Sequence, residues 1–279
     1  MKPPAAADLV RSITEQEIQT FENDGIVVLR QLFNPQWVEC LRQWADEDMA
    51  DPGRLHQELT KPGSTGRFFF DTFMWTYHDG FKSFVHQSPA AQIAAQMMRA
   101  EKVNIFFDQL LIKEPGTEER TPWHQDMPYW PVRGNDICTV WLALDTVDAA
   151  SGAVEYIKGS HRWGASYKPP AFAGDEKYKL DLPAVPDIDS ERDKHEFAQF
   201  DLEPGDCTVH HGLLVHGAPG NSQSDRRRRA VVSRWTGNDA RYTPAPNIQE
   251  MMWDPEIEAG GPLDSDLWPV IWQRESASA

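Results

Sequence analysis

The fold is decided by Ile137-Cys-Thr-Val-Trp-Leu-Ala-Leu144, which a polar segment separates from Ala153-Val-Glu-Tyr-Ile157. β-branched and aromatic residues recur in both runs, as they do in strands, and the Asp, Ser and Gly residues between them are typical of turns. Similar runs predict further strands at 103 to 113, 206 to 210, 213 to 216 and 229 to 235. Short strands separated by turn residues from residue 103 onward predict an all-β core.

Helices are predicted before this core. Thr14-Glu-Gln-Glu17 has the form of a capping box and opens the first helix. A strand is expected at 26 to 29, and Asn34-Pro35 starts a second helix. Residues 51 to 66 are rich in Gly, Pro and charge and predict a long loop, and 88 to 99 predict another helix.

The whole chain, residues 1 to 279, is expected to form a single domain. Loosely structured tails are predicted at about 1 to 12 and 260 to 279. The stretch from about 165 to 197 is rich in Pro, Asp, Glu and Lys and has little periodicity. It is expected to be an insertion between core strands, which often serves as a lid.

Charge and composition exclude several classes of partner. The formal net charge of -16 disfavours nucleic acid and anionic membranes, because both are polyanions. No apolar run approaches the length of a membrane span, and the first residues lack the apolar region of a signal peptide. The isolated cysteines at 40, 138 and 207 suggest neither a disulfide framework nor a zinc site. We expect a soluble cytoplasmic protein, monomeric or homodimeric.

The densest chemical signal is Thr121-Pro-Trp-His124-Gln-Asp126. In an extended segment the side chains at i and i+2 lie on one face, so His124 and Asp126 can present an imidazole and a carboxylate to one ion. Two histidines and one carboxylate that leave positions open form the facial triad of non-haem Fe(II) oxygenases. The pair therefore predicts an iron site that needs a second histidine from elsewhere in the chain.

Candidates for the second histidine follow a predicted turn at 203 to 206. His216 is preferred because it ends an apolar run, 213 to 215, and precedes Gly217, which lets backbone and ligands approach closely. The other candidates are expected to be structural or to support the ligands, and they are His210 and His211.

The last predicted core strand carries arginines on one face. At every second position this face presents Arg228, Ala230, Val232 and Arg234. An arginine that points into a barrel needs an anion, and its planar fork can bind a carboxylate through two hydrogen bonds. The distal carboxylate of 2-oxoglutarate would meet this need while its 2-oxo acid end chelates the iron.

The order of these motifs resembles the phytanoyl-CoA dioxygenase family of Fe(II)- and 2-oxoglutarate-dependent oxygenases. The resemblance spans about residues 13 to 242, and an ordered series is more specific than any single motif. In chain order the matching elements are Thr14-Glu-Gln-Glu17, Asp24-Gly-Ile-Val-Val-Leu-Arg30, Trp123-His-Gln-Asp126, Val140-Trp-Leu-Ala-Leu-Asp145, Ser151-Gly152, Gly159-Ser-His-Arg162, Pro204-Gly-Asp206, His216-Gly-Ala-Pro-Gly-Asn221 and Arg228-Arg-Ala230.

The resemblance implies a double-stranded β-helix, which is a cupin-like jelly-roll barrel with flanking helices and Fe(II) in its mouth. It implies His124, Asp126 and His216 as the catalytic iron ligands, with 2-oxoglutarate and O₂ as cosubstrates. Halogenases of this broader class have a small residue in place of the aspartate, so Asp126 favours hydroxylation over halogenation.

Residues that contact 2-oxoglutarate also follow from the resemblance. Arg228 is expected to anchor the distal carboxylate. The segment before it is one residue longer than is usual in the family, so Arg227 is an alternative. Further contacts are expected from Trp141 and from either Gln109 or Lys113.

The implied reaction is hydroxylation of an unactivated C–H bond of a small-molecule metabolite, with release of succinate and CO₂. Desaturation, ring formation and epimerisation use the same iron ligands and stay open. Aromatic and sulfur-containing side chains beside the motifs are expected to line the substrate pocket, and they are Trp123, Met127, Tyr129, Trp130, Trp163 and Trp235.

Two readings from other classes compete with an oxygenase. A cupin-type metal-dependent hydrolase or isomerase would use the same barrel without 2-oxoglutarate, and the inward arginine argues against it. A catalytically silent binding protein would be expected to have lost one of the iron ligands, and this sequence retains all three.

Overall fold

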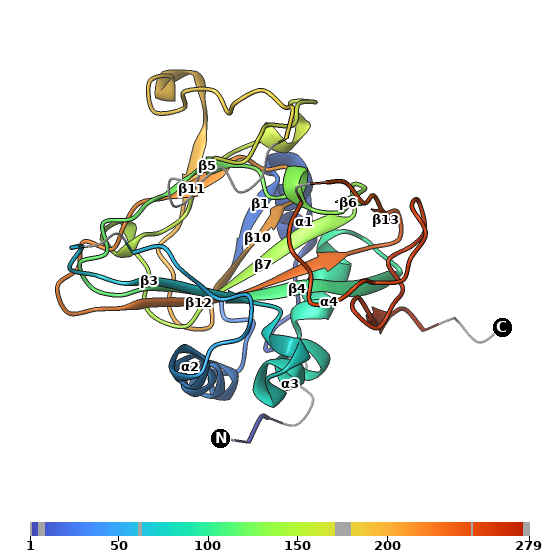
Figure 1. The fold of residues 1–279 in the computed structure, drawn as a ribbon, viewed down its shortest axis with the longest axis horizontal. Coiled ribbons are helices and arrows are strands. Elements are labelled where there is room, and N and C mark those ends of the chain that lie inside the picture. The colour runs from blue at the N-terminus through green and yellow to red at the C-terminus, as the bar shows by residue number, and fades with distance from the viewer. Residues whose placement is uncertain (1, 5–8, 61–62, 171–179, 247, 276–279) are drawn as a thin grey trace.

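The computed structural model describes residues 2–4, 9–60, 63–170, 180–246 and 248–275. Two β-sheets face each other and form the barrel (Figure 1). The eight-stranded sheet has the order β1 (Ile26–Leu29), β10 (Cys207–His211), β7 (Ile137–Ala143), β12 (Arg228–Thr236), β4 (Lys102–Lys113), β3 (Phe68–Thr72), β2 (Gln57–Glu58), and β14 (Val270–Gln273) also pairs with β4. The four-stranded sheet has the order β5 (Thr121–His124), β11 (His216–Ala218), β8 (Glu155–Ile157) and β9 (Phe197–Gln199).

The remaining elements connect or cover these sheets. A two-stranded ribbon pairs β6 (Val132–Arg133) with β13 (Arg241–Tyr242). The helices are α1 (Glu15–Asp24), α2 (Pro35–Ala50), α3 (Asp79–Gln87) and α4 (Ala90–Met97). Short 3-10 turns occur at η1 (Met74–Thr76), η2 (Met127–Tyr129), η3 (Ala149–Ser151), η4 (Ser160–Arg162) and η5 (Arg192–Lys194). None of the helices in the described part of the chain has the length and apolar composition of a membrane span.

The first helix begins where the sequence predicts. Thr14 Oγ1 accepts a hydrogen bond from the backbone N–H of Glu17, and the Glu17 carboxylate accepts one from the backbone N–H of Thr14. Gly25 ends the helix with φ 74°, a left-handed conformation that glycine adopts without strain. The chain then enters β1, so this helix is fixed to one edge of the large sheet.

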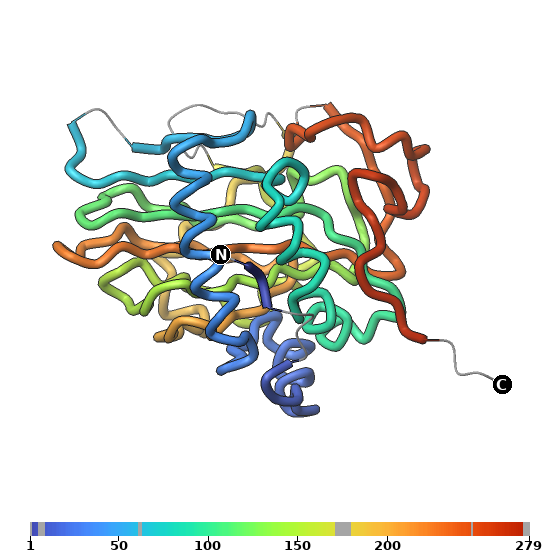
Figure 2. The backbone as a smooth tube through the Cα atoms, turned by 90° about the horizontal axis from the view of Figure 1, so that it is seen from below, coloured from blue at the N-terminus to red at the C-terminus, as the bar shows by residue number. Residues whose placement is uncertain are grey.

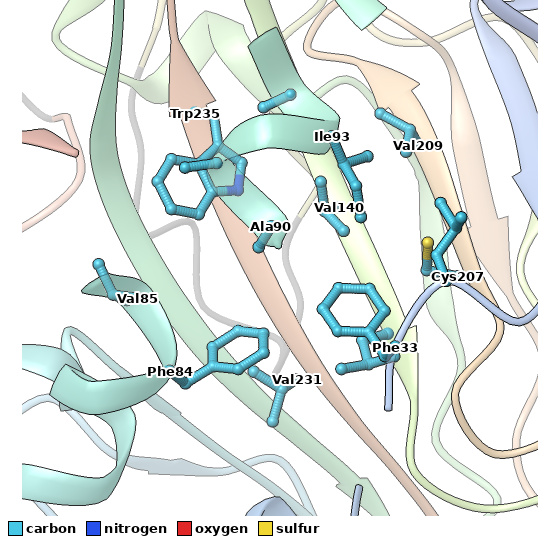
Figure 3. Packing of buried hydrophobic residues seen from close by; sticks show 14 of the residues in the cluster. Phe33, Phe84, Val85, Ala90, Ile93, Val140, Cys207, Val209, Val231 and Trp235 are labelled. Carbon is cyan, nitrogen blue, oxygen red and sulfur yellow. The ribbon is translucent and has the colours of Figure 1, made fainter. Parts of the chain in front are cut away.

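The main hydrophobic core lies between the helices and the outer face of the large sheet. Figure 2 views the molecule from that side, with the helices in front of the long strands. Side chains from α3 and α4, such as Phe84 and Ile93, pack with Val140, Val231 and Trp235 of the sheet (Figure 3). Burial of these apolar side chains is the largest favourable term in folding, and it fixes the large sheet as a rigid support.

The inner face of the same sheet is different. Because side chains alternate along a strand, the residues between the core positions point to the other sheet. Two rows cross the sheet in register: Thr208, Trp141, Val232 and Gln109 form one row, and His210, Thr139, Arg234 and Phe107 form the next.

The jelly-roll core is confirmed, and the structure corrects three local predictions. Residues 213 to 215 form a turn rather than a strand, since Leu214 N–H donates back to His211 O and β11 begins only at His216. Leu214 and Val215 are fully buried in this turn, so the apolar run marks burial and not a strand. The helix expected at 88 to 99 covers only 90 to 97, after Pro89.

The expected loose tail at 260 to 279 is the third correction. Residues 270 to 273 pair with β4, and Leu267 and Trp268 are buried in the apolar cluster that contains Phe106. Three hydrogen bonds from the Asn104 amide to this segment hold it in place. In the other tail, Val10 N–H donates to Leu32 O. Residues 1, 5–8 and 276–279 lie outside the described ones.

The predicted insertion at about 165 to 197 contains, in its described part, only the 3-10 turn η5 and the start of β9. Residues 171–179 of it lie outside the described ones. Pro170 reaches the wall of the central cavity. A role as a lid stays a prediction.

Candidate active site

A cavity of about 570 Å³ lies between the two sheets. Its walls come from β3, β4, β7 and β12 of the large sheet and from β5 and β11 of the small sheet. The loop before β2 and residues 249 and 250 also line it. This volume is in the range of small-molecule sites.

Strand pairing brings the two predicted histidine ligands together. β11 runs antiparallel to β5 with His216 opposite His124, and the two ring centroids are 4.2 Å apart. Asp126 joins them from just beyond the end of β5. One ligand atom of each of these three buried residues lies within 4.8 Å of the others.

Asp126 reaches this position by a different route from the one the spacing predicts. β5 ends at His124, and Asp126 has φ -74° and ψ -51°, so it lies in a turn and not in an extended strand. Gln125 holds this turn, because its amide donates to the carbonyls of Ala165 and Leu213. His124 and Asp126 face one point, although the strand that was expected to carry both residues ends at His124, two residues before Asp126.

Both histidines are oriented for binding through the same nitrogen. His124 Nδ1 is 2.8 Å from Pro122 O, and His216 Nδ1 is 2.9 Å from Leu214 O. A carbonyl only accepts hydrogen bonds, so each Nδ1 carries the proton and each Nε2 offers its lone pair. Burial, and then the neighbouring imidazole of His124, lower the pKa of His216 well below its usual value. The neutral form that a metal requires is therefore favoured.

The Asp126 carboxylate is surrounded by donors. Tyr129 Oη donates to Oδ1 at 3.0 Å, and Thr139 Oγ1 lies 3.5 Å from Oδ2. Burial alone would raise the pKa of Asp126, but the Arg234 guanidinium and the nearby imidazoles hold it well below its usual range. Two neutral imidazoles and an ionised carboxylate are the donor set of a mononuclear Fe(II) site with open positions.

His210 and His211 take different places. His210 is fully buried beside the triad, with Nε2 3.7 Å from Asp126 Oδ2, and burial lowers its pKa. His211 faces away, with Nε2 at 3.0 Å from Asn135 O and Nδ1 accepting from Leu213 N–H. His211 is thus structural, whereas His210 lines the cavity behind the carboxylate.

Arg228 points into the cavity from β12. Its side chain is 2% exposed, and Nε and Nη1 have no hydrogen-bond partner among the described residues. Burial lowers the pKa of Arg228 to about 10. The guanidinium carbon is 5.6 Å from the centre of the Trp141 ring. A buried cation with free donors is suited to a carboxylate.

Two of the residues that were predicted to contact 2-oxoglutarate, Arg227 and Lys113, lie outside the cavity lining. Arg227 points to the outside, where it donates to Asp46 and Glu114, so the geometry favours Arg228. Lys113 is buried, but its Nζ donates to Pro219 O at 2.6 Å and it is not among the lining residues. Gln109 and Trp141 do line the cavity, and their contact with 2-oxoglutarate stays a prediction.

Most of the side chains that were predicted to line the substrate pocket are packed in the hydrophobic cores instead. Of the six side chains expected at the substrate, only Tyr129 lines the cavity. Trp130 and Trp235 are fully buried in the cores, and Met127 packs with Trp130. Trp123 lies against Phe197, outside the lining residues. The apolar lining comes instead from Leu55, Leu59, Phe68, Phe70, Phe107 and Leu111.

Sequence reasoning missed two features of this lining. β3 was not predicted, although Phe68, Phe69 and Phe70 form a run of aromatic residues typical of a strand. Arg234 was placed on the inward face by alternation, yet it was given no role. The signal for both was present in the sequence.

Comparison with known proteins identifies the family of the chain. The family model described as Phytanoyl-CoA dioxygenase (PhyH) matches residues 21–230. The chain belongs to this family. The resemblance inferred from the ordered motifs is therefore confirmed.

Curated relatives match parts of the chain. A probable phytanoyl-CoA dioxygenase of Caenorhabditis elegans is 26% identical over 131 residues, 43% of this chain and 37% of that protein. The dioxygenase cdmD of Talaromyces verruculosus is 33% identical over 143 residues, 48% of this chain and 39% of that protein. The chain thus spans about two-fifths of the length of these relatives.

Solved structures share the fold over nearly the whole chain. The epimerase SnoN from nogalamycin biosynthesis, in complex with Fe3+, alpha ketoglutarate and nogalamycin RO, has a TM-score of 0.74 at 20% identity, covering 92% of this chain and 98% of its own. EctD from S. alaskensis with bound Fe has a TM-score of 0.68 at 21% identity, covering 94% and 95%. The jelly-roll fold of this PhyH protein is that of non-haem oxygenases.

Proposed function

We propose that this PhyH protein is a Fe(II)- and 2-oxoglutarate-dependent dioxygenase that hydroxylates an unactivated C–H bond of a small molecule. The observation that carries the proposal is one cavity that holds both a His-Asp-His cluster and a buried arginine, two of whose nitrogens lack hydrogen-bond partners among the described residues. Family membership and the fold of iron-containing neighbours support it.

The residues fit the metal that the family implies. His124 and His216 would bind Fe(II) through Nε2, and Asp126 through its carboxylate. When bound together, Fe(II), 2-oxoglutarate and O₂ supply the oxidising chemistry that leaves succinate and CO₂ and adds oxygen to the substrate. The protein itself orients the ligands and the cosubstrate.

Arg228 is the proposed anchor for the distal carboxylate of 2-oxoglutarate. A carboxylate would satisfy the donors of Arg228 that lack partners among the described residues. The Trp141 ring beside the guanidinium limits its movement, and Gln109 adds an amide to the same wall. This pairing argues against a hydrolase that works without 2-oxoglutarate, because such an enzyme would leave a buried cation unpaired.

The apolar part of the lining would disfavour water in the reaction space. Phe70, Phe107 and Leu111 face the cavity, and they favour a substrate with a sizeable apolar part. The net charge of -16 disfavours an acyl-CoA, which is a polyanion. We therefore propose a small metabolite other than the one in the family's name.

The cellular setting is part of the proposal. Cys40, Cys138 and Cys207 are buried free thiols, which supports a reducing, cytoplasmic location. A monomer or homodimer is proposed, acting without nucleic acid or membrane as a partner.

Turnover tests the proposal. The Fe(II) protein should form succinate from 2-oxoglutarate in air, faster when a substrate from a metabolite extract is present. The mass of the product separates the reactions: hydroxylation adds one oxygen atom, desaturation or ring formation removes two hydrogen atoms, and epimerisation leaves the mass unchanged. No succinate under any condition would exclude the proposed class.

A further inference from the structure

A second arginine lies in the same cavity without a role in the proposed function. Arg234 is on β12, is 6% exposed and lines the cavity. Its Nη2 donates to Gln109 Oε1 at 2.8 Å, while Nε and Nη1 have no hydrogen-bond partner among the described residues. Its guanidinium carbon lies over the Phe107 ring, 4.3 Å from the ring centre.

Arg234 is only partly compensated. Within 4.0 Å of its guanidinium, the described residues place one carboxylate, Asp126, whose Oδ2 is 3.7 Å from Nε. That distance is too long for a hydrogen bond. Asp126 also accepts from Tyr129, and it is the proposed metal ligand. A bound metal would draw on the same negative charge, so the guanidinium of Arg234 would stay a buried cation whose Nε and Nη1 lack hydrogen-bond partners among the described residues.

Arg228 and Arg234 lie at separate ends of the wall that β12 contributes. In register, Arg228 is opposite Lys113, whereas Arg234 is opposite Phe107 and Thr139. Six strand positions separate their Cα atoms by about 20 Å. The anion at Arg228 therefore leaves the other guanidinium to a second anion, or to the opposite end of the same molecule.

The lining around Arg234 combines this cation with apolar surface. Phe107 packs beneath the guanidinium, and Leu55 lines the same cavity and packs against the apolar cluster that contains Phe107. Gln109 orients the guanidinium through its carbonyl oxygen, which leaves the amide NH₂ as an additional donor. A carboxylate joined to an apolar body matches this arrangement of groups.

We propose that Arg234, oriented by Gln109, is a second carboxylate receptor of the cavity, and that the substrate is a small carboxylic acid with an apolar body. The proposal rests on the proposed function for the identity of the first anion. The same chemistry could be supplied by the metal-chelating 1-carboxylate of 2-oxoglutarate, and the experiment separates the two sources.

Binding to the Mn(II)-loaded protein tests the proposal without turnover. Calorimetric titration uses 2-oxoglutarate first, and then a series of aliphatic and aryl-substituted carboxylic acids, each with its neutral amide. In wild type, at least one acid should bind about tenfold or more tightly than its amide, as expected for a hydrogen bond to a charged group. Arg234→Gln should remove this preference and leave the Kd of 2-oxoglutarate within about threefold.

Controls distinguish a receptor from a structural arginine. Arg227→Gln removes a charge outside the cavity beside the same strand and should leave both titrations unchanged. Arg234→Lys retains the charge and should restore part of the acid preference. Thermal unfolding of each variant shows whether it is folded before it is titrated.

The outcomes are decisive. If no acid binds wild type better than its amide, while Arg234→Gln weakens 2-oxoglutarate by about tenfold or more, the receptor serves the cosubstrate and the substrate assignment is overturned. If Arg234→Gln changes neither titration, the receptor itself is overturned. Failure of 2-oxoglutarate to bind wild type would count against the proposed function, and the acid-amide comparison on the Mn(II) protein would still report on Arg234.

Discussion

The two faces of the eight-stranded sheet are built from the same strands and differ in almost every physical property. On the outer face, Val140, Val231 and Trp235 pack against helices and are fully buried. On the inner face, the alternate residues of the same strands include Arg228 and Arg234, each with unpartnered donors among the described residues. The outer face contributes packing, and it holds in place the polar inner groups that are costly to bury.

The largest expected effect is on the inner face. His216→Ala removes one of three clustered ligands. Loss of a residue that only hydrogen-bonds to a metal ligand costs up to roughly 100-fold in activity, so loss of the ligand itself should lower succinate formation by more than that. The unfolding midpoint of the metal-free protein should stay near that of wild type. The matched control is His211→Ala, which lies outside the cavity and should retain most of the activity. Equal losses in both variants would mean that the ligand is misassigned.

On the outer face, truncation should act on stability. Trp235→Ala should lower the free energy of unfolding by about 3–5 kcal/mol, because a fully buried indole leaves a cavity. Urea unfolding measures this loss, and Trp235→Phe should recover part of it. Trp253→Ala, at a position 43% exposed, should change the free energy of unfolding by less than about 0.5 kcal/mol. A similar small change at Trp235 would contradict its place in the core.

Asp48 is an exception on the outer side, since it is a buried carboxyl that shares the Tyr77 hydroxyl with Asp71. Burial, and then the negative charge of Asp71, raise the pKa of Asp48 to about 7. A carboxyl whose pKa is raised by folding stabilises the protein fully below its unfolded pKa, near 4, and this contribution is lost as pH rises through 7.

Asp48→Asn should therefore remove part of the pH dependence of stability. Between pH 4 and pH 8, the free energy of unfolding of wild type should fall by roughly 2–4 kcal/mol more than that of the variant. Urea unfolding at the two pH values measures this difference. Parallel pH profiles in the two proteins would show that Asp48 is ionised in the folded state throughout.

The smallest expected effect separates the two candidate anchors. Arg228→Gln should raise the 2-oxoglutarate concentration needed for half-maximal succinate formation by about 10- to 100-fold, the value of a charge-assisted pair. Arg227→Gln loses only surface ion pairs with Asp46 and Glu114 and should change this concentration by less than about threefold. The reverse order would move the anchor to Arg227.

Much of this organisation could be predicted from local patterns. The β-branched and aromatic residues of strands such as 102 to 113 and 228 to 236 predicted these strands. The Glu17 capping box fixed the start of the first helix. His216 was selected from three neighbours by its apolar context, and the structure places it opposite His124 through a pairing between distant strands.

What could not be predicted depends on tertiary packing. Aromatic side chains near a motif indicate burial but not which face they occupy, so the expected substrate wall was mostly core. The face that Trp235 occupies could have been predicted, because side chains alternate along a strand and Arg234 next to it points inward. The buried end at Leu267 and Trp268 was read as a tail because its partner, Asn104, lies far away in the sequence.

Absorption of the anaerobic complex tests the central claim most directly. Adding Fe(II) and then 2-oxoglutarate to the metal-free protein should produce the visible charge-transfer band of the iron chelate, which His216→Ala should abolish. Admission of air should bleach the band with formation of succinate. A wild-type protein that binds Fe(II) and shows no band with saturating 2-oxoglutarate would contradict the account.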